Sequence, residues 1–401
     1  MTGIPRKLAA ILLALALLCP SFGQAAARKK TVADWMEGFE SGENWFGEGF
    51  AYDITDTETC WELLQRPITV LNVGEREVIY PLVEPGGRKV NNDPYGGFIA
   101  GSTAAVHVLG PDEGGWTLVE GMDDYDRLIR GYVRTKLLKT VTPNKTYGII
   151  IDKLVQRLYV FIDGELFSSC AISTGLPNGE KPYYETASGE YLISSWVGNF
   201  EIEGLMCEKA MRFNNGDLIH QVPYTILGDG TQRFSVFEAK LGQRASHGCV
   251  RTARYPNDDG LAIGWLWDNL KKGTKVLVWD DDGRRYPYPA DDLALYYNPS
   301  GGSRYHLSAT CAGVRVRYHP MTPLTYGQLD EGTYRKLEPC DFCTPPKRRG
   351  WIDKLNLARG IITRADLEEE RDALERENLP EGYHETEGGA IAHTVEIIIL
   401  D

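Results

Sequence analysis

Basic side chains are scarce relative to acidic ones in this 401-residue chain, which has 43 Lys and Arg residues against 56 Asp and Glu residues. The formal net charge is −13 at pH 7. A chain this acidic lacks the electrostatic footprint with which proteins bind nucleic acids. The charge also predicts repulsion from anionic membranes and anionic polymers. Nucleic acid is therefore excluded as a predicted partner, and any anionic substrate must be held by a local site.

Long hydrophobic runs are missing as well, apart from a short one near the start of the chain, Leu8–Leu18. This run is too short to span a bilayer. Arg6 and Lys7 precede it and Ala25–Ala27 follow it, which is the pattern of a secretory signal peptide over residues 1–27. An uncleaved anchor or a lipoprotein is the alternative. Cleavage would change the net charge from −13 to −15, and it predicts a secreted, extracytoplasmic protein with no transmembrane segment.

Cysteines are few, eight in all, and Cys19 lies within the predicted signal peptide. An odd number, seven, would then remain in a secreted chain, which indicates at least one free thiol. Cys170 falls within an apolar strand pattern and is predicted to be a buried core thiol. Cys207 is either a partly exposed thiol or the partner of Cys60 in a disulfide.

Glycine, in contrast, is abundant at 43 residues, and short apolar segments alternate with Gly, Asp and Pro. This pattern predicts a mainly β chain with some α-helix. After a lead-in segment of residues 28–66, residues 67–140 are predicted to form a small β-barrel. Gly-Gly-Trp at 114–116 and Gly-Tyr-Val at 131–133 resemble the end of bacterial Src-homology-3-like barrels. Between them, residues 122–130 depart from that pattern, and we expect an elongated hairpin loop there.

Residues 146–281 form the next predicted domain. The dipeptide Asp163-Gly164 between two apolar runs is a strong signal for a type I′ hairpin. Residues 158–162 are apolar on both faces, which predicts a buried strand. Residues 257–273 have acidic residues at their start and two lysines and a glycine at their end, which predicts a helix.

The most distinctive motif of this domain is SHGCVR at residues 246–251. A thiol is only a few per cent ionised at neutral pH, but a neighbouring imidazolium lowers its pKa by several units. The motif therefore predicts that Cys249 is a stabilised thiolate, with either His220 or His247 as its partner. Residues 247 and 249 share one face of an extended backbone, whereas a bend at Gly248 would separate them.

Two further residues of the motif have side chains suited to acyl chemistry. Ser246 and Arg251 are close enough in sequence to orient a histidine or to hold an oxyanion or a carboxylate. Backbone N–H groups beside Gly248 are candidates for an oxyanion hole, because no side chain blocks the approach there.

The combination of His220 with SHGCVR at 246–251, preceded by TASGEYLISS, resembles the L,D-transpeptidase catalytic domain family over residues 146–281, about a third of the chain. The resemblance implies a β-sandwich-like mixed sheet with the nucleophile at the floor of a cleft. The roles that it implies are Cys249 as nucleophile, His220 as general base, Gly248 and Cys249 as oxyanion donors, His247 and Ser246 as supporting residues, and Arg251 and Tyr224 as substrate-binding residues.

The implied reaction is acyl transfer through a cysteine thioester, with peptidoglycan stem peptides as donor and acceptor and a 3→3 cross-link as product. Catalysis would need no cofactor. Two alternatives remain at this stage: an L,D-carboxypeptidase that uses the same thiol, and a non-catalytic cell-wall-binding scaffold.

Two departures from the family pattern and a predicted lid surround the predicted site. Gln221 stands after the base, where the family often has Gly or Ser, so that the group which orients the imidazole differs. Residues 228–244 lengthen the spacer before the cysteine motif and predict an enlarged loop at the cleft mouth. Residues 197–216 are the predicted lid over the cleft.

A second cluster of cysteines lies in residues 295–346, with His306, Cys311, Cys340 and Cys343 as its members. Three thiolates and one imidazole suit a closed, structural zinc site. Tyr305-His306 and Pro339-Cys340 resemble small Cys/His knuckles of bacterial exported proteins. A disulfide within the C-x-x-C pair is the alternative. The remaining residues, 347–401, are predicted to form an acidic helical tail.

Overall fold

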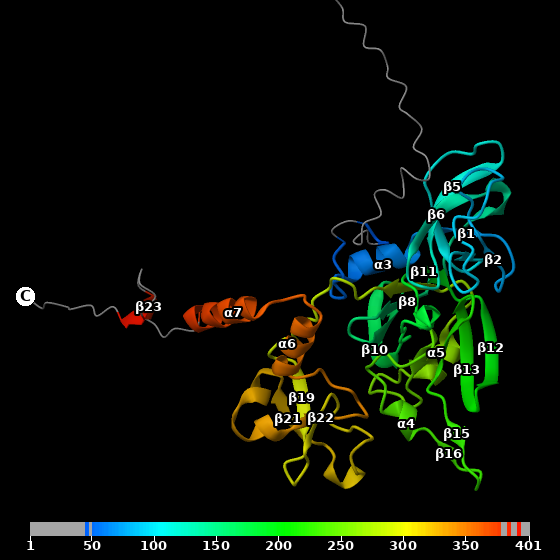
Figure 1. The fold of residues 1–401 in the computed structure, drawn as a ribbon. Helices are drawn as coiled ribbons and strands as arrows, with labels where there is room; N and C mark the ends of the chain where they lie inside the picture. Colours follow the sequence, from blue (N-terminus) through cyan, green and yellow to red (C-terminus); the bar gives the residue numbers. More distant parts are fainter. Residues whose placement is uncertain (1–44, 48–49, 378–382, 386–390, 394–401) are drawn as a thin grey trace, which may run out of the picture. The chain divides into compact units, whose positions relative to one another are not determined.

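The computed structural model describes residues 45–47, 50–377, 383–385 and 391–393. Most of its strands belong to three sheets of nine, five and four strands (Figure 1). The prediction of a mainly β fold with a mixed sheet and a few helices is confirmed. The predicted signal peptide lies outside the described residues.

The largest sheet has nine strands in the order β11-β18-β8-β9-β10-β17-β14-β13-β12. Along the chain these strands are β8 (Tyr147–Asp152), β9 (Arg157–Ile162), β10 (Glu165–Ser173), β11 (Gly189–Leu192), β12 (Ser195–Ile202), β13 (Leu205–Asn214), β14 (Asp217–Gln221), β17 (Val250–Thr252) and β18 (Lys275–Trp279). Two neighbouring pairs are parallel, β14 with β17 and β18 with β8, and the others are antiparallel. We call it the catalytic sheet, because it carries the predicted site.

Both faces of the catalytic sheet are covered by apolar side chains. Val160 of β9 lies in the main core on one face, and Phe161 lies in a second cluster with Leu64 of helix α3 (Thr57–Gln65). The side chain of Asp56 caps this helix by accepting the N–H of Thr59. The prediction of a strand with two buried faces is therefore confirmed.

The turn between β9 and β10 also follows the prediction. Asp163 and Gly164 have φ angles of 49° and 100°, the left-handed values that a type I′ turn needs. The predicted helix is shorter than expected, however, because α5 spans only Ile263–Asn269. The Asn257 side chain accepts the N–H of Leu261 at 2.9 Å and holds the preceding residues in a turn.

The N-terminal sheet has five antiparallel strands in the order β6-β5-β4-β1-β7. They are β1 (Ile68–Leu71), β4 (Ala105–Val108), β5 (Trp116–Met122), β6 (Leu128–Arg134) and β7 (Leu138–Val141), and β2 (Val78–Ile79) pairs separately with β3 (Ile99–Ala100). The expectation of an elongated loop at residues 122–130 was wrong. Both strands extend further, and the β5–β6 loop of residues 123–127 is compact because Asp123 accepts the N–H groups of Tyr125 and Arg127.

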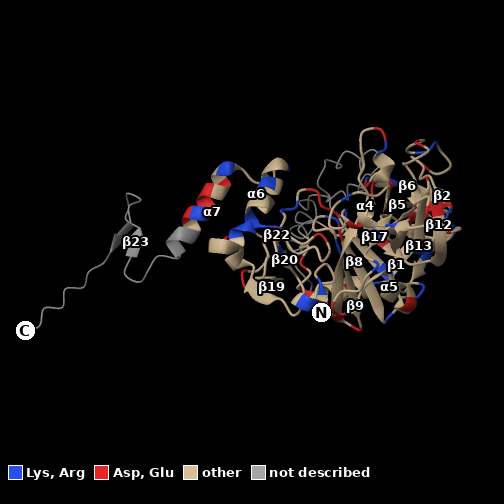
Figure 2. Ribbon diagram, turned by 90° about the horizontal axis from the view of Figure 1, so that it is seen from below, with Lys and Arg blue, Asp and Glu red and all other residues tan. Residues whose placement is uncertain are grey.

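The C-terminal sheet has the order β21-β19-β20-β22 and encloses a small core that includes Leu295, Tyr305 and Tyr326. Its strands are β19 (Ala294–Tyr297), β20 (Arg304–His306), β21 (Thr322–Thr325) and β22 (Glu338–Pro339), and the following elements are α6 (Arg349–Ala358), α7 (Arg364–Glu377), β23 (Tyr383–Glu385) and β24 (Ile391–His393). Thr363 caps α7 by accepting the N–H of Asp366 at 3.2 Å. Figure 2 shows charges of both signs along α7.

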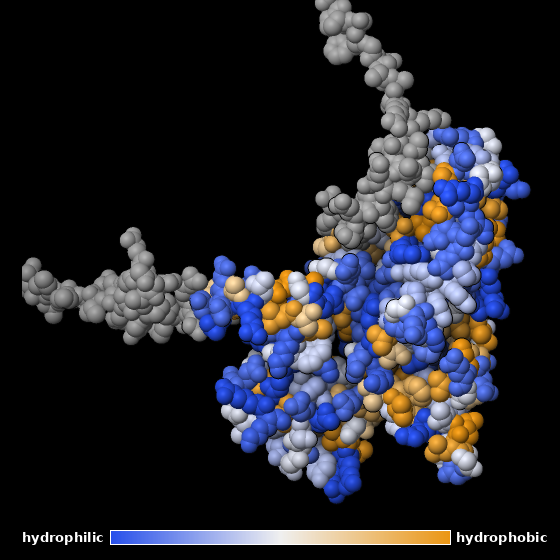
Figure 3. All heavy atoms as spheres, in the orientation of Figure 1, coloured by the Kyte–Doolittle hydropathy of each residue, from blue (hydrophilic) through white to orange (hydrophobic). Residues whose placement is uncertain are grey.

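The remaining elements are short. They are α4 (Ser235–Glu238), β15 (Thr225–Ile226), β16 (Gln232–Arg233) and the 3-10 turns η1 (Thr135–Leu137), η2 (Pro182–Tyr184), η3 (Val316–Tyr318), η4 (Gly327–Asp330) and η5 (Gly332–Lys336). Hydrophobic side chains are scattered over the surface in Figure 3, and exposed ones include Ile226 and Leu227 at the β15–β16 hairpin. Within the described ranges, no helix combines the length and the hydrophobicity that crossing a membrane requires.

The cysteines of the described residues are all unpaired. Cys170 is buried, as predicted. Both alternatives for Cys207 were wrong, because its side chain is buried and free. Cys60 belongs to the cluster beneath α3, whereas Cys207 lies in β13 at the other end of the catalytic sheet.

Candidate active site and candidate metal centre

The predicted catalytic residues lie on two adjacent parallel strands of the catalytic sheet. In the register of β14 and β17, Ile219 is paired with Val250 and His220 with Arg251. Ile219 and Val250 point into the main core. Because side chains alternate along a strand, His220 points to the opposite face. Cys249 immediately precedes β17, and the same alternation places its side chain on the face of His220.

His220 is almost fully buried, with 3% of its surface exposed. Its Nδ1–H donates to the backbone carbonyl of Gln221 at 2.6 Å, which leaves Nε2 as a hydrogen-bond acceptor. The group that orients the imidazole is thus the main-chain carbonyl of Gln221, the residue that departs from the family pattern. The ring of Phe200, from β12, meets the imidazole edge to face at 5.7 Å between centroids. Burial lowers the pKa of His220 to about 4, so that the imidazole is neutral at pH 7.

Cys249 is partly exposed and unpaired. Its Sγ lies 4.0 Å from the carbonyl oxygen of Gly216. The crowded surroundings, and then the negative charge of Asp217, raise the pKa of this thiol to about 12, although the N–H of Leu218 and the charge of Arg251 oppose the rise. Both pKa shifts run opposite to those that a thiolate–imidazolium pair would need. A neutral imidazole faces the same side of the sheet as a protonated thiol, which is the starting state for general-base catalysis.

Gly248 shapes the turn that presents the sulfur. Its φ angle is +115°, and a Cβ at this position would lie 2.3 Å from Oδ1 of Asp217. The Thr186 hydroxyl donates to the Gly248 carbonyl at 2.5 Å, and the Ser246 hydroxyl donates to the Cys249 carbonyl. In the described part of the chain, the N–H groups of Gly248 and Cys249 have no acceptor. Both N–H groups can therefore donate hydrogen bonds to an oxyanion, as an oxyanion hole requires.

The other predicted site residues surround this turn but differ in exposure. His247 is exposed, and its ring stacks on Tyr184 at 4.0 Å between centroids. Arg251 is buried and donates to the carbonyl of Ala245 at 2.9 Å. Tyr224 is buried as well, and its hydroxyl donates to Glu208 at 2.7 Å. His247 thus lies on the outside of the turn and Arg251 is tied to the segment before it, whereas Tyr224 packs with Phe234 in another cluster.

Several contributors to the site had no signal in the sequence. Asp217 packs on Gly248, Thr186 holds the carbonyl of Gly248, and Glu185 forms two hydrogen bonds with Arg244 at 3.0 and 3.1 Å. Asp217 stands three residues before His220, and because residues of a strand share a face only at even spacings, the sequence pattern does not mark it. Thr186 and Glu185 are distant in sequence, and only the folded chain brings them to the turn.

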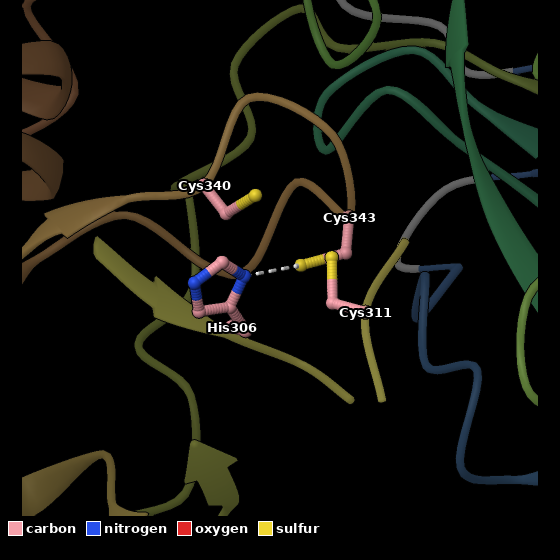
Figure 4. Close-up of side chains that lie close together, drawn as sticks. All are labelled: His306, Cys311, Cys340 and Cys343. Carbon is pink, nitrogen blue, oxygen red and sulfur yellow. Dashed lines mark hydrogen bonds between the residues drawn. The ribbon is translucent and has the colours of Figure 1, made fainter. Parts of the chain in front are cut away.

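The predicted metal ligands come together in the C-terminal module. Ligand atoms of His306, Cys311, Cys340 and Cys343 all lie within 4.8 Å of one another, and Figure 4 shows the four side chains converging. Nδ1 of His306 is 3.7 Å from Sγ of Cys343. A tetrahedral zinc ion with bonds of about 2.3 Å separates its sulfur ligands by about 3.8 Å.

The surroundings of the sulfurs fit a metal as well. Each accepts a backbone N–H: Cys311 from Gly313 at 3.4 Å, Cys340 from Phe342 at 3.3 Å, and Cys343 from Leu307 at 3.4 Å. Such bonds stabilise thiolates and fix the ligands in place. The residues present therefore fit a closed Cys₃His zinc site.

Comparison with known proteins identifies the domain that carries the site. Residues 146–278 match the family model of the YkuD L,D-transpeptidase catalytic domain. No curated protein matches the chain. Similar solved structures include an L,D-transpeptidase (Yku) from Stackebrandtia nassauensis, with 23% identity and a TM-score of 0.24 over 34% of this chain and 57% of that one.

Two mycobacterial structures are similar over more of the chain. An L,D-transpeptidase from Mycobacterium smegmatis has 14% identity and a TM-score of 0.27 over 54% of this chain and 92% of that one. One from Mycobacterium tuberculosis has 18% identity and a TM-score of 0.26 over 45% and 77% of the two chains. The match with the Stackebrandtia structure, by contrast, spans little more than half of that chain. The span that matches the family model of the YkuD L,D-transpeptidase catalytic domain, residues 146–278, thus bears both His220 and Cys249.

Proposed function

We propose that this protein is an exported peptidoglycan L,D-transpeptidase that makes 3→3 cross-links through a thioester on Cys249. The observation that carries the proposal is the parallel pairing of β14 with β17, which brings His220 beside the strand that Cys249 immediately precedes. The unengaged N–H groups of Gly248 and Cys249 support it further. The signal-peptide pattern of residues 1–27 supports export, and the family match supports the class of reaction.

In the first step, Nε2 of neutral His220 takes the thiol proton as the sulfur attacks the carbonyl carbon of the third residue in a donor tetrapeptide stem. The N–H groups of Gly248 and Cys249 stabilise the oxyanion that forms. The imidazolium then returns its proton to the amine of the terminal D-alanine, which leaves, and the thioester remains.

In the second step, an amine of a neighbouring stem attacks the thioester. The C–S bond breaks, the cross-link forms, and the thiol is restored with the proton that the amine loses. Ser246 and His247 hold the turn during both steps, and Arg251 and Tyr224 shape the substrate side of the cleft from below. No cofactor takes part in these steps.

Incubation of the protein with defined tetrapeptide muropeptides, followed by mass spectrometry, tests this proposal. We expect dimers with a 3→3 link, no dimers from Cys249→Ala, and normal dimers from the control Cys60→Ala, which removes a thiol from the cluster beneath α3. Trimmed tripeptides without dimers would mean an L,D-carboxypeptidase instead. The absence of both products would mean a non-catalytic wall-binding scaffold.

We also propose that His306, Cys311, Cys340 and Cys343 hold a structural zinc ion. The donor set, its burial and the three N–H···S bonds support this assignment. Metal analysis of the purified protein should find one zinc per chain, lost in Cys340→Ser and retained in Cys60→Ser. A folded, zinc-free protein with a disulfide between Cys340 and Cys343 would contradict it.

A further inference from the structure

Two carboxylates from different sheets meet beside the catalytic turn. Asp217 begins β14 and packs on Gly248, and Asp124 lies in the β5–β6 loop of the N-terminal sheet. The charge of Asp124 raises the pKa of Asp217, and the side chain of Asn214 favours the charged form of both carboxylates. We call Asp124 and Asp217 the acidic pair.

The β5–β6 loop is fastened to the catalytic sheet by buried contacts. Asp126 accepts both the N–H and the hydroxyl of Ser188, at 2.6 and 3.0 Å. Asp126 is also paired with the ammonium of Lys153, whose side chain is fully buried. The same ammonium lies 3.2 Å from Glu185, and the carbonyl oxygen of Glu185 lies beside Gly248. The N-terminal sheet therefore supplies Asp124 to the site on a fixed support.

The negative charge of the acidic pair is not balanced by an ion pair within the described residues. Both carboxylates are half-buried, and neither forms an ion pair with any described residue. Burial and then the neighbouring charge of Asp123 raise the pKa of Asp124 to about 7, and burial and then Asp124 raise the pKa of Asp217 well above its usual range. The pair consequently retains a proton in the free protein, which an arriving cation would displace.

The Asn214 side chain supplies an independent sign of a missing ligand. It is 97% buried, since only 3% of its surface is exposed, and its Oδ1 has no hydrogen-bond partner among the described residues. An unpaired buried carbonyl oxygen costs free energy unless a donor reaches it. Beside two carboxylates, the donor that fits is a cation carrying several N–H bonds, and a primary ammonium carries three.

We propose that Asp124 and Asp217 bind the side-chain ammonium of the acceptor stem peptide and thereby select an amine acceptor for the cross-link. This inference rests on the proposed function, because it assigns a site to the second substrate of that reaction. The position suits the task, since Asp217 packs against the residue next to Cys249. The N-terminal sheet would then be part of the active site, in addition to any role in wall attachment.

Neutralising the acidic pair should also help the chemistry. The negative charge of Asp217 disfavours ionisation of the Cys249 thiol. The pair takes one proton from the bound ammonium, which leaves a free amine to attack the thioester. The protonated pair then no longer carries the charge that disfavours the thiolate, so that the thiolate becomes a better leaving group. The acceptor would therefore promote its own reaction when it binds.

The test compares Asp124→Asn and Asp217→Asn with a matched control, Asp163→Asn. Asp163 is exposed at the opposite end of β10 from the turn, and its φ of 49° is one that asparagine adopts readily. KM is measured for a tripeptide acceptor with a free side-chain amine, and the rate of Cys249 acylation by a carbapenem is measured separately. Thermal unfolding checks that each variant is folded.

We expect the KM for the amine to rise about tenfold in both acidic-pair variants, and much more than carbapenem acylation changes. An unchanged KM, with dimers still formed by the wild type, would overturn this inference and leave the proposed function standing. Failure of the wild type to be acylated would instead overturn the proposed function. Tight binding of Ca²⁺ or Mg²⁺ that Asp217→Asn abolishes would reassign the pair to a metal and also refute the inference.

Discussion

At the scale of single residues, the proposed chemistry depends on how burial shifts the pKa values of His220 and Cys249. Burial disfavours the charged form of each, so it lowers the pKa of the imidazole to about 4 and raises that of the thiol to about 12. In the proposed reaction, proton transfer must therefore accompany attack on the substrate, since these pKa shifts favour the neutral form of both side chains.

The depressed pKa of His220 makes a prediction about stability. The unfolded chain binds a proton at this residue near pH 6.5, whereas the folded chain binds it near pH 4. Stability is therefore complete above pH 6.5 and is lost as the pH falls toward 4. Between pH 7.5 and pH 4.5, the wild type should lose about 2–3 kcal/mol more unfolding free energy than His220→Gln. Equal losses in urea titrations of both proteins would contradict the burial of a neutral imidazole.

Gly248 makes a second prediction at this scale. Alanine there would have to adopt a φ of +115° and would place Cβ 2.3 Å from Asp217. We expect Gly248→Ala to lower the free energy of unfolding by about 1–3 kcal/mol and carbapenem acylation by 100-fold or more. Gly179→Ala, where nothing lies within 4 Å, serves as the control. Acylation of Gly248→Ala at the wild-type rate would show that the turn geometry is dispensable.

The site residues that are contiguous in the sequence could be predicted, and those that only folding brings together could not. SHGCVR is contiguous, so its chemistry was visible in the sequence. Thr186 reaches the turn, and Asp124 comes near Asp217, only through tertiary packing, and no local sequence pattern predicts either approach. The directions of the pKa shifts could not be predicted for the same reason, because burial of His220 depends on Phe200 and on neighbouring strands.

At the scale of elements, hairpins were easier to predict than the pairing of distant strands. Asp163-Gly164 specifies its own turn, and the strands on either side follow. The parallel contact of β14 with β17 joins residues about thirty positions apart and has no local signature. The β5–β6 loop was expected to be long because its charged residues hide the continuation of both strands; the pairing of Met122 with Leu128 shows that the ladder runs to the loop.

The β5–β6 loop also makes a prediction about stability. The Lys153 ammonium is fully buried against Asp126 and Glu185. Asp126→Asn would leave a buried charge with one partner, so we expect a loss of about 3 kcal/mol in unfolding free energy. The exposed Asp163→Asn should change it by less than about 0.5 kcal/mol.

The double variant Asp126→Asn/Lys153→Met separates charge from packing. It removes the Lys153 ammonium that Asp126→Asn leaves with one partner, and it should recover part of the lost unfolding free energy. Calorimetry of the three variants checks both expectations. If Asp126→Asn were as stable as the wild type, the loop would not be fastened by this ion pair.

At the scale of the whole molecule, the C-terminal module and the catalytic sheet have separate cores. If zinc holds the module, a chelator should expose residues 304–343 to hydrogen exchange, because binding free energy and folding free energy are coupled in such sites. Residues 146–278 should stay protected, and carbapenem acylation should continue. Unchanged exchange in residues 304–343 after complete removal of metal would show that the module folds without it.

The central claim is that the Cys249 sulfur carries the acyl group, and intact-protein mass spectrometry after carbapenem treatment tests it most directly. We expect a single adduct per chain, located on Cys249 by peptide mapping, and none on the buried Cys170 or Cys207. Cys249→Ala should give no adduct, and His220→Gln should form it at least 100-fold more slowly. An adduct on another residue, or none on the folded wild-type protein, would contradict the account.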